Sequence, residues 1–93
     1  MVKTVKIRGK RYRLRFADLP PELDGDCDNP ATKGKAIRIN RKLRGLEQLD
    51  TIIHELLHAA FWDLDEQAIL EAGTDVAKAL WRLGYRINPP TKD

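Results

Sequence analysis

Two histidines spaced one helical turn apart point most directly to chemistry in this chain. His54 and His58 flank Glu55 in the run His-Glu-Leu-Leu-His, an HExxH sequence, and they are the only histidines among the 93 residues. Residues four positions apart lie on one helix face, so both imidazoles can address a single point. Imidazole nitrogen at about 2.0–2.1 Å is a preferred ligand of Zn²⁺. We therefore expect these histidines to bind one divalent ion, zinc or a first-row neighbour.

Glu55 completes the pattern. It lies about 100° round the helix from His54, so it can reach a water held by the metal without binding the metal itself. A carboxylate in that position is suited to act as a general base. The alternative interpretation is an ordinary amphipathic helix that carries two histidines and a surface glutamate.

The third metal ligand is not specified by the motif. A catalytic zinc takes three protein ligands and keeps a fourth position for water, and without a third histidine we expect a carboxylate downstream. Glu66, at the start of the second predicted helix, is our first candidate, and Glu71 and Asp65 are its rivals. Glu71 has the ExxxD spacing with Asp75, whereas Glu66 could instead form a capping box with Asp63.

Two further residues near the motif have candidate roles. Asp75 is predicted to accept a hydrogen bond from a histidine ring N–H and so fix its orientation, with an exposed helix carboxylate as the alternative. Cys27 is the single cysteine, which excludes an intrachain disulfide and fits a reducing cytoplasm. A role for its thiol as a metal ligand or inhibitor is the less favoured interpretation.

The motif lies in a segment of helical periodicity. From Leu46 the apolar residues recur with the period of a helix, which predicts an active-site helix over 46–62. Its apolar arc comprises Leu49, Ile52, Ile53, Leu56, Leu57, Ala59 and Ala60, and its other stripe comprises Glu47, Thr51, His54, Glu55, His58 and Trp62. A second helix is predicted over 65–84. Its apolar face is Ile69, Ala72, Val76, Leu80 and Leu83, opposite Gln67, Glu71, Thr74, Lys78 and Arg82.

The N-terminal part alternates with the period of a strand. Residues 1–16 predict a β-hairpin with a turn at Gly9-Lys10, which would pair Ile7 with Tyr12 and Val5 with Leu14. A loop is predicted over 17–35, followed by a short strand at 36–40. Residues 85–93 are predicted to form a C-terminal tail. We therefore expect a single α+β domain over residues 1–93. A small antiparallel sheet, made of the hairpin and one further strand, would pack against the active-site helix and a second, supporting helix.

Charge is distributed unevenly along the chain. Residues 1–44 carry thirteen Lys/Arg and five Asp/Glu, a net +8, whereas residues 45–93 carry four and nine, a net −5, which sums to +3. The basic half either neutralises the acidic half or meets an anionic partner such as nucleic acid. No segment approaches the roughly 20 apolar residues that cross a bilayer, and the N-terminus lacks the apolar run of a signal peptide. We therefore expect a cytoplasmic protein with no membrane partner.

With these motifs the chain resembles zincin-type metallopeptidases, and more narrowly small phage-encoded metallopeptidases related to SprT-like proteins and minimal gluzincins. The resemblance covers 50–60, 63–66 and 80–85, with the strand at 37–39. It implies an α+β fold and hydrolysis of a peptide or protein substrate by zinc-activated water with Glu55 as base, in the bacterial host cytoplasm if the protein is phage-encoded. SprT-like proteins use a third histidine, which this chain lacks, so their ligand set does not transfer. The metzincin pattern also fails, since Phe61 replaces its glycine.

The sequence offers several candidates for the substrate-binding strand and the oxyanion-stabilising residue of a peptidase. Strand 36–40 could hold an extended substrate at its edge, and Tyr12, Tyr85 or an arginine could stabilise the oxyanion. The alternative function is a nucleic-acid-binding or regulatory protein with a structural metal and a basic N-terminal hairpin.

Overall fold

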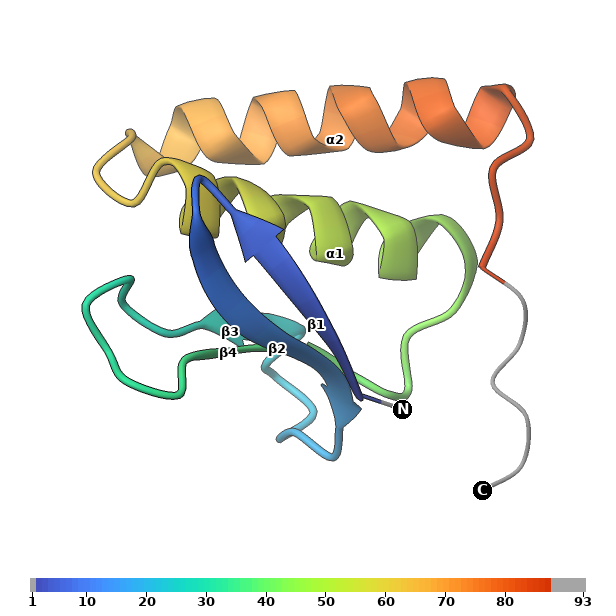
Figure 1. The fold of residues 1–93 in the computed structure, drawn as a ribbon. Coiled ribbons are helices and arrows are strands. Elements are labelled where there is room, and N and C mark those ends of the chain that lie inside the picture. The colour runs from blue at the N-terminus through green and yellow to red at the C-terminus, as the bar shows by residue number, and fades with distance from the viewer. Residues whose placement is uncertain (1, 88–93) are drawn as a thin grey trace.

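The computed structural model describes residues 2–87, which form four strands and two helices in three layers (Figure 1). The elements are β1 (Val2–Ile7), β2 (Lys10–Ala17), β3 (Gly25–Cys27), β4 (Ala36–Asn40), α1 (Gly45–Ala60) and α2 (Glu66–Arg82). The sheet has the order β1-β2-β4-β3. Helix α1 packs against the sheet, and α2 contacts α1 but none of the strands. The predicted α+β class is confirmed.

The sheet is mixed, so the predicted antiparallel arrangement is wrong. β1 and β2 pair antiparallel, as do β3 and β4, but β2 and β4 run parallel. A parallel pair needs a crossover of about a dozen residues or more, and the segment 18–35 is long enough to provide it. Within that segment, which we predicted to be a loop, β3 forms and extends the sheet beyond β4.

The hairpin register also differs from the prediction. The turn is at Arg8-Gly9, so Val5 lies opposite Tyr12 and Ile7 lies opposite Lys10. Arg8 and Gly9 have φ values of 49° and 82°, and positive φ at both positions is the geometry of a turn that follows the twist of the strands. Arg8 tolerates it here with a tertiary hydrogen bond: its guanidinium donates to Ala60 O at 3.0 Å and so covers the C-terminal end of α1.

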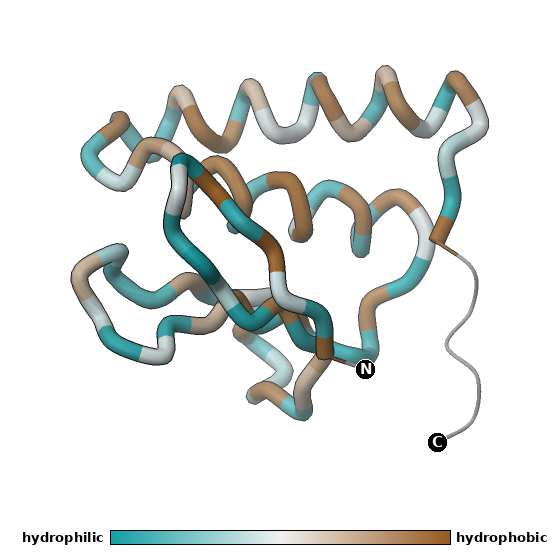
Figure 2. Tube along the Cα trace, viewed as in Figure 1, coloured by the Kyte–Doolittle hydropathy of each residue, from teal (hydrophilic) through white to brown (hydrophobic). Residues whose placement is uncertain are grey.

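The hydrophobic core lies between the sheet and α1. Ile37 and Ile39 of β4 are fully buried, and the core cluster also contains Tyr12, Ile52 and Ala59. The hydrogen bond from Tyr12 Oη to Ala59 O, at 3.4 Å, joins β2 to α1. Figure 2 shows hydrophilic and hydrophobic residues alternating along the hairpin, and the apolar residues of β2, Tyr12, Leu14 and Phe16, belong to or pack against the core cluster. The core therefore fixes the helix that carries the HExxH motif.

Both helices are shorter than predicted. α1 ends at Ala60 and not at residue 62, and α2 spans Glu66–Arg82 and not 65–84. Asp65 is the N-cap of α2, because its carboxylate accepts a hydrogen bond from Ala68 N at 3.0 Å. Neither helix is long and apolar enough to cross a membrane in the described part of the chain. The predicted tail begins at 85, and its residues 88–93 lie outside the described residues.

The packed side of α2 differs from the predicted apolar face. Ile69 is fully buried as expected, but the other buried positions are Gly73 and Ala77. Val76 and Leu83, which we placed on the core face, are 45% and 74% exposed. Close approach of the two helices requires small side chains at their contact, and Gly73 and Ala77 provide them. Val76 and Leu83 consequently stay in solvent.

Candidate metal centre

His54, His58 and Glu66 converge on one point. His58 Nε2 lies 3.1 Å from His54 Nε2, and the Glu66 carboxylate oxygens lie 3.2 Å from His54 Nε2 and 3.0 Å from His58 Nε2. One ligand atom from each residue falls within 4.8 Å of the others. These three side chains form a group that could hold a metal ion.

The geometry of this group is compatible with a tetrahedral metal ion. Tetrahedral ligands about 2.0–2.1 Å from a metal stand about 3.3–3.4 Å apart, close to the 3.0–3.2 Å separations between these atoms. Burial is the largest influence on the imidazole of His58 and lowers its pKa, which favours the neutral, ligating form. Two imidazoles and one carboxylate are also a ligand set that leaves a fourth position open for water.

Two helices and the connection between them position the ligands. His54 and His58 come from successive turns of α1, and Glu66 is the first residue of α2. The connection 61–65 reverses the chain so that Glu66 returns to α1. A hydrogen bond from Thr74 Oγ1 to the Asp50 carboxylate, at 3.2 Å, also ties the helices together. The geometry of the cluster therefore depends on how α2 packs on α1.

The carboxylates of the other two ligand candidates, Glu71 and Asp65, form hydrogen bonds away from the histidines. Glu71 is exposed and accepts a hydrogen bond from Gln67 Nε2 at 2.9 Å, while Asp65 caps α2. Asp75 is exposed, and within residues 2–87 no hydrogen bond or ion pair joins it to either histidine. Of the three ligand candidates, only Glu66 belongs to the group that the structure brings together. The role proposed for Asp75 has no contact to support it.

Glu55 lies beside the cluster and is buried, with 7% of its surface exposed. Desolvation by burial, followed by the negative charges of Asp26 and Glu66, raises the pKa of Glu55 to about 7. It shares a cavity of about 320 Å³ with the three candidate ligands. The remaining lining residues are Gly25, Asp26, Cys27 and Trp62. The carboxylate of a candidate base and the candidate ligands thus face the same space.

Strand β3, which the sequence did not predict, forms one wall of this cavity. A Cβ at Gly25 would lie 2.8 Å from Arg38 O, 3.0 Å from Thr51 Cγ2 and 3.3 Å from Glu55 Cγ. Only glycine therefore lets β3 run this close to β4 and α1. A three-residue strand is too short to show alternation, and Gly25 was the one available signal.

Ion pairs hold β3 against β4. Arg38 of β4 donates to Asp26 at 2.9 Å and to Asp28 at 3.0 Å, and Asp28 also accepts a hydrogen bond from Ala36 N at 2.9 Å. The Arg38 guanidinium is the main reason that the pKa of the Asp28 carboxyl lies below its ordinary value. β3 is consequently a fixed wall despite its length.

β3 also changes which strand could hold a substrate. β4 lies between β2 and β3, so the expectation that 36–40 offers an exposed edge is wrong. β3 is the edge strand on this side of the sheet, and its residues line the cavity. Of the oxyanion candidates, Tyr12 is buried in the core, Tyr85 lies at the other end of α2, and neither lines this cavity.

Cys27 is a neutral thiol in this environment. Desolvation by burial and the nearby Glu55 carboxylate raise its pKa to about 12, and its Sγ lies 3.4 Å from Asp28 O as a hydrogen-bond donor. It does not belong to the metal-binding group. The favoured interpretation of Cys27 as a bystander is consistent with this placement.

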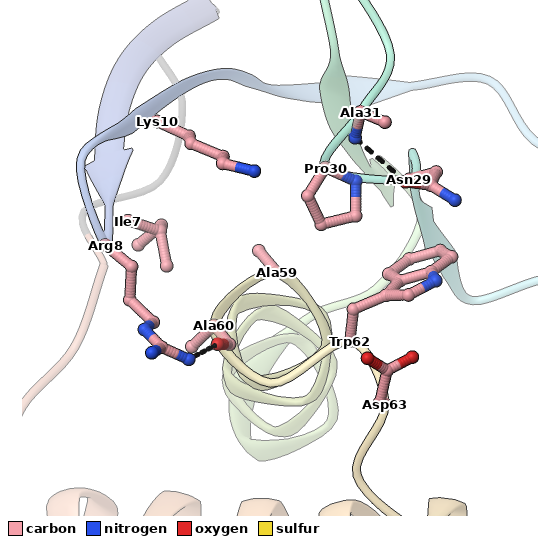
Figure 3. A pocket seen from close by; sticks show the side chains of 10 residues that line it. All are labelled: Ile7, Arg8, Lys10, Asn29, Pro30, Ala31, Ala59, Ala60, Trp62 and Asp63. Atoms are coloured by element: carbon pink, nitrogen blue, oxygen red, sulfur yellow. Dashed lines mark hydrogen bonds between the residues drawn. The ribbon is translucent and has the colours of Figure 1, made fainter.

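A larger cavity, of about 460 Å³, lies beside the end of α1 (Figure 3). Its walls come from the hairpin tip, the loop after β3 and the α1–α2 connection, and the Lys10 side chain extends into it. None of the candidate metal ligands lines it, but Trp62 lines both cavities. Trp62 thus borders both the cavity of the candidate ligands and a second space large enough for a side chain.

No protein-family model, curated protein or solved structure matches this chain. Functional inference therefore rests on its own residues.

The first prediction concerns the third ligand. Glu66→Gln should weaken Zn²⁺ binding by more than the roughly 10–100-fold cost of losing a ligand's hydrogen-bond partner, because it removes a ligand charge. Glu71→Gln, the same change five residues along α2, should leave affinity unchanged. Competition with a chromophoric chelator measures both. Weak binding by Glu71→Gln together with wild-type binding by Glu66→Gln would reverse the assignment.

The second prediction contrasts two glycine substitutions. Gly25→Ala should lower the free energy of unfolding by about 1–3 kcal/mol, since the added methyl group meets the Arg38 carbonyl and the Glu55 stem. Gly73→Ala should raise it by about 0.5–1 kcal/mol, because its methyl group finds ordinary contacts of 3.5–3.7 Å and alanine favours the helix. Urea unfolding followed by circular dichroism tests the pair. Equal effects of the same sign would refute the close approach of β3 to α1.

Proposed function

We propose that this protein is a zinc-dependent metallopeptidase. The observation that carries the proposal is the placement of the buried Glu55 carboxylate on the cavity where His54, His58 and Glu66 converge. A structural zinc site is closed by four protein ligands, whereas a catalytic site has three and an open position. The three-ligand group supports catalysis over a purely structural metal.

Glu55 is the general base in this proposal. Bound zinc would polarise the scissile carbonyl and lower the pKa of its water to about 7. The Glu55 carboxylate accepts a proton from the attacking water and returns it to the leaving amine. Burial against β3 holds this carboxylate in place and excludes bulk water from it. The net reaction adds water across a peptide bond and leaves Glu55 as it began.

An extended peptide segment is the substrate that the cavity suits. β3 has an unpaired edge beside the cavity, and an extended chain can add to such an edge through backbone hydrogen bonds. Beyond Trp62, the cavity of about 460 Å³ provides space for a substrate side chain. The substrate would thus be held by its backbone along β3 and by one side chain near Trp62.

The third prediction tests the base. Glu55→Gln keeps the shape of the side chain but cannot accept a proton, so peptide hydrolysis should fall by at least about 10²–10⁴-fold. Zinc stoichiometry should be unchanged, because Glu55 lies outside the ligand group. A fluorogenic peptide library and metal analysis of the same samples measure the two properties. Glu71→Gln is the matched control and should retain activity.

Two outcomes would oppose the assignment. Wild-type hydrolysis by Glu55→Gln, with contaminating protease excluded, would show that Glu55 is not the base. Stoichiometric zinc without hydrolysis of any library peptide or protein by the wild type would favour a structural metal.

A second candidate function, binding to nucleic acid, is favoured by the outer face of the sheet. Arg11, Arg13 and Arg15 alternate along β2 and are exposed on the face away from α1, and Lys6 lies opposite Arg11. None of these four cations forms an ion pair with another residue in the described range 2–87. Tyr12 and its neighbouring aromatic side chain Phe16 face the core, so they cannot stack on bases. The surface is suited to phosphate contacts without base recognition.

The fourth prediction concerns this basic face. If its four cations contact phosphates, duplex DNA binding should weaken with salt at a logarithmic slope of about −3 to −4. Changing Arg11, Arg13 and Arg15 to Gln should abolish binding, whereas changing the exposed Lys33, Lys42 and Lys78 to Gln should not. Fluorescence anisotropy across a salt series measures the slope. Negligible binding at low salt would exclude this function.

A further inference from the structure

One flank of α2 exposes apolar side chains within the described chain. Among the helices and strands α2 contacts only α1, and along one flank of α2 Ala72, Val76, Ala79 and the C-cap residue Leu83 are exposed. Val76 and Leu83, the two large ones, are 45% and 74% exposed. A contiguous apolar strip of this kind on a small domain indicates an interaction surface.

The spacing of the strip matches a helix–helix contact. Its members are separated by four, three and four residues, which is the alternation of the two core positions in a heptad repeat. We call Ala72, Val76, Ala79 and Leu83 the α2 stripe. A stripe with this period can run along the whole length of a second helix.

We propose that the α2 stripe is a self-association surface, on which a second copy of this chain packs its own α2 in an antiparallel, two-fold arrangement. Placing Val76 opposite Ala79 of the second copy puts Ala72 opposite Leu83. Each layer then combines one small and one large side chain, so the two surfaces interdigitate. A parallel pairing would place Ala72 against Ala72 and Leu83 against Leu83. The two alanines would then leave a gap at their end of the contact.

Charge complementarity selects the same arrangement. Asp75 and Arg82 flank the stripe on its solvent side, are exposed, and form no ion pair with another residue of 2–87. In the antiparallel register Asp75 of each copy lies beside Arg82 of the other, and the two-fold axis produces this contact twice. Flanking charges of this type set the orientation of paired helices.

The wider charge of α2 agrees with this pairing. Its acidic residues, Glu66, Glu71 and Asp75, precede its basic residues, Lys78 and Arg82. An antiparallel copy therefore places the acidic half of one helix on the basic half of the other. A parallel copy would oppose like charges at both ends. The inference depends on neither the metal nor the proposed peptidase activity.

The fifth prediction is tested on the full, untagged chain. Sedimentation velocity from low micromolar to near-millimolar concentration should show a monomer–dimer equilibrium in low salt. Val76→Lys should abolish the dimer, and either Asp75→Arg or Arg82→Asp should weaken it at least about tenfold by opposing like charges. The double variant Asp75→Arg with Arg82→Asp should restore it. Lys42→Glu, a reversal of charge at an exposed position outside α2, is the control.

Each contrary outcome overturns a stated part of the proposal. A wild type that is monomeric at every concentration would exclude self-association through any surface. A dimer that survives Val76→Lys would place the contact elsewhere. Failure of the double variant to restore association would refute the antiparallel register. Because Val76, Asp75 and Arg82 are exposed, the variants should unfold at the wild-type temperature when both are measured at a concentration where the wild type is monomeric, which separates lost association from lost folding.

Discussion

The packing of α2 on α1 is the constraint on which the candidate site depends. His54 and His58 belong to one rigid helix, but Glu66 reaches them only because the second helix returns along the first. A shift of α2 by one turn would move Glu66 about 5.4 Å, well beyond its present 3.0–3.2 Å separation from the two imidazoles. Gly73, the Asp50–Thr74 hydrogen bond and the ligands themselves hold one alignment. Binding of a metal ion by this group would thus be linked to helix packing, and each would stabilise the other.

Local sequence patterns predicted the parts of the fold that depend on short-range physics. Strand 36–40 matches β4, and both helices were placed to within two residues at each end, because hydrophobic periodicity records which face each element buries. The side chains of His54 and His58 lie together because both residues belong to one helix, in which positions four residues apart share a face. Glu66 was favoured over Glu71 and Asp65 from its place at the start of the second helix. The metal-binding group in the structure includes it and neither rival.

The features that the sequence did not reveal depend on contacts between distant segments. The hairpin turn lies one residue earlier than predicted, at a position where the Arg8 guanidinium donates a hydrogen bond to Ala60 O, 52 positions away. β3 depends on Arg38 and on the space left by Gly25, neither of which produces a period. The packed side of α2 was misjudged because small residues, rather than large apolar ones, face α1. In each case a tertiary contact outweighed local preference.

The burial of Glu55 is difficult to explain as a contribution to stability. Removing a carboxylate from water is costly unless a cation or hydrogen bonds compensate it, and Asp26 and Glu66 add further negative charge. An apolar side chain at position 55 would fill the space below β3 without that cost. A metal ion beside His54 would supply the missing positive charge, and a chemical role would account for a buried carboxylate at a position where folding alone disfavours it. A carboxylate that is not a ligand would add nothing to a structural metal site, so the burial of Glu55 supports the proposed activity more directly than the candidate ligands do.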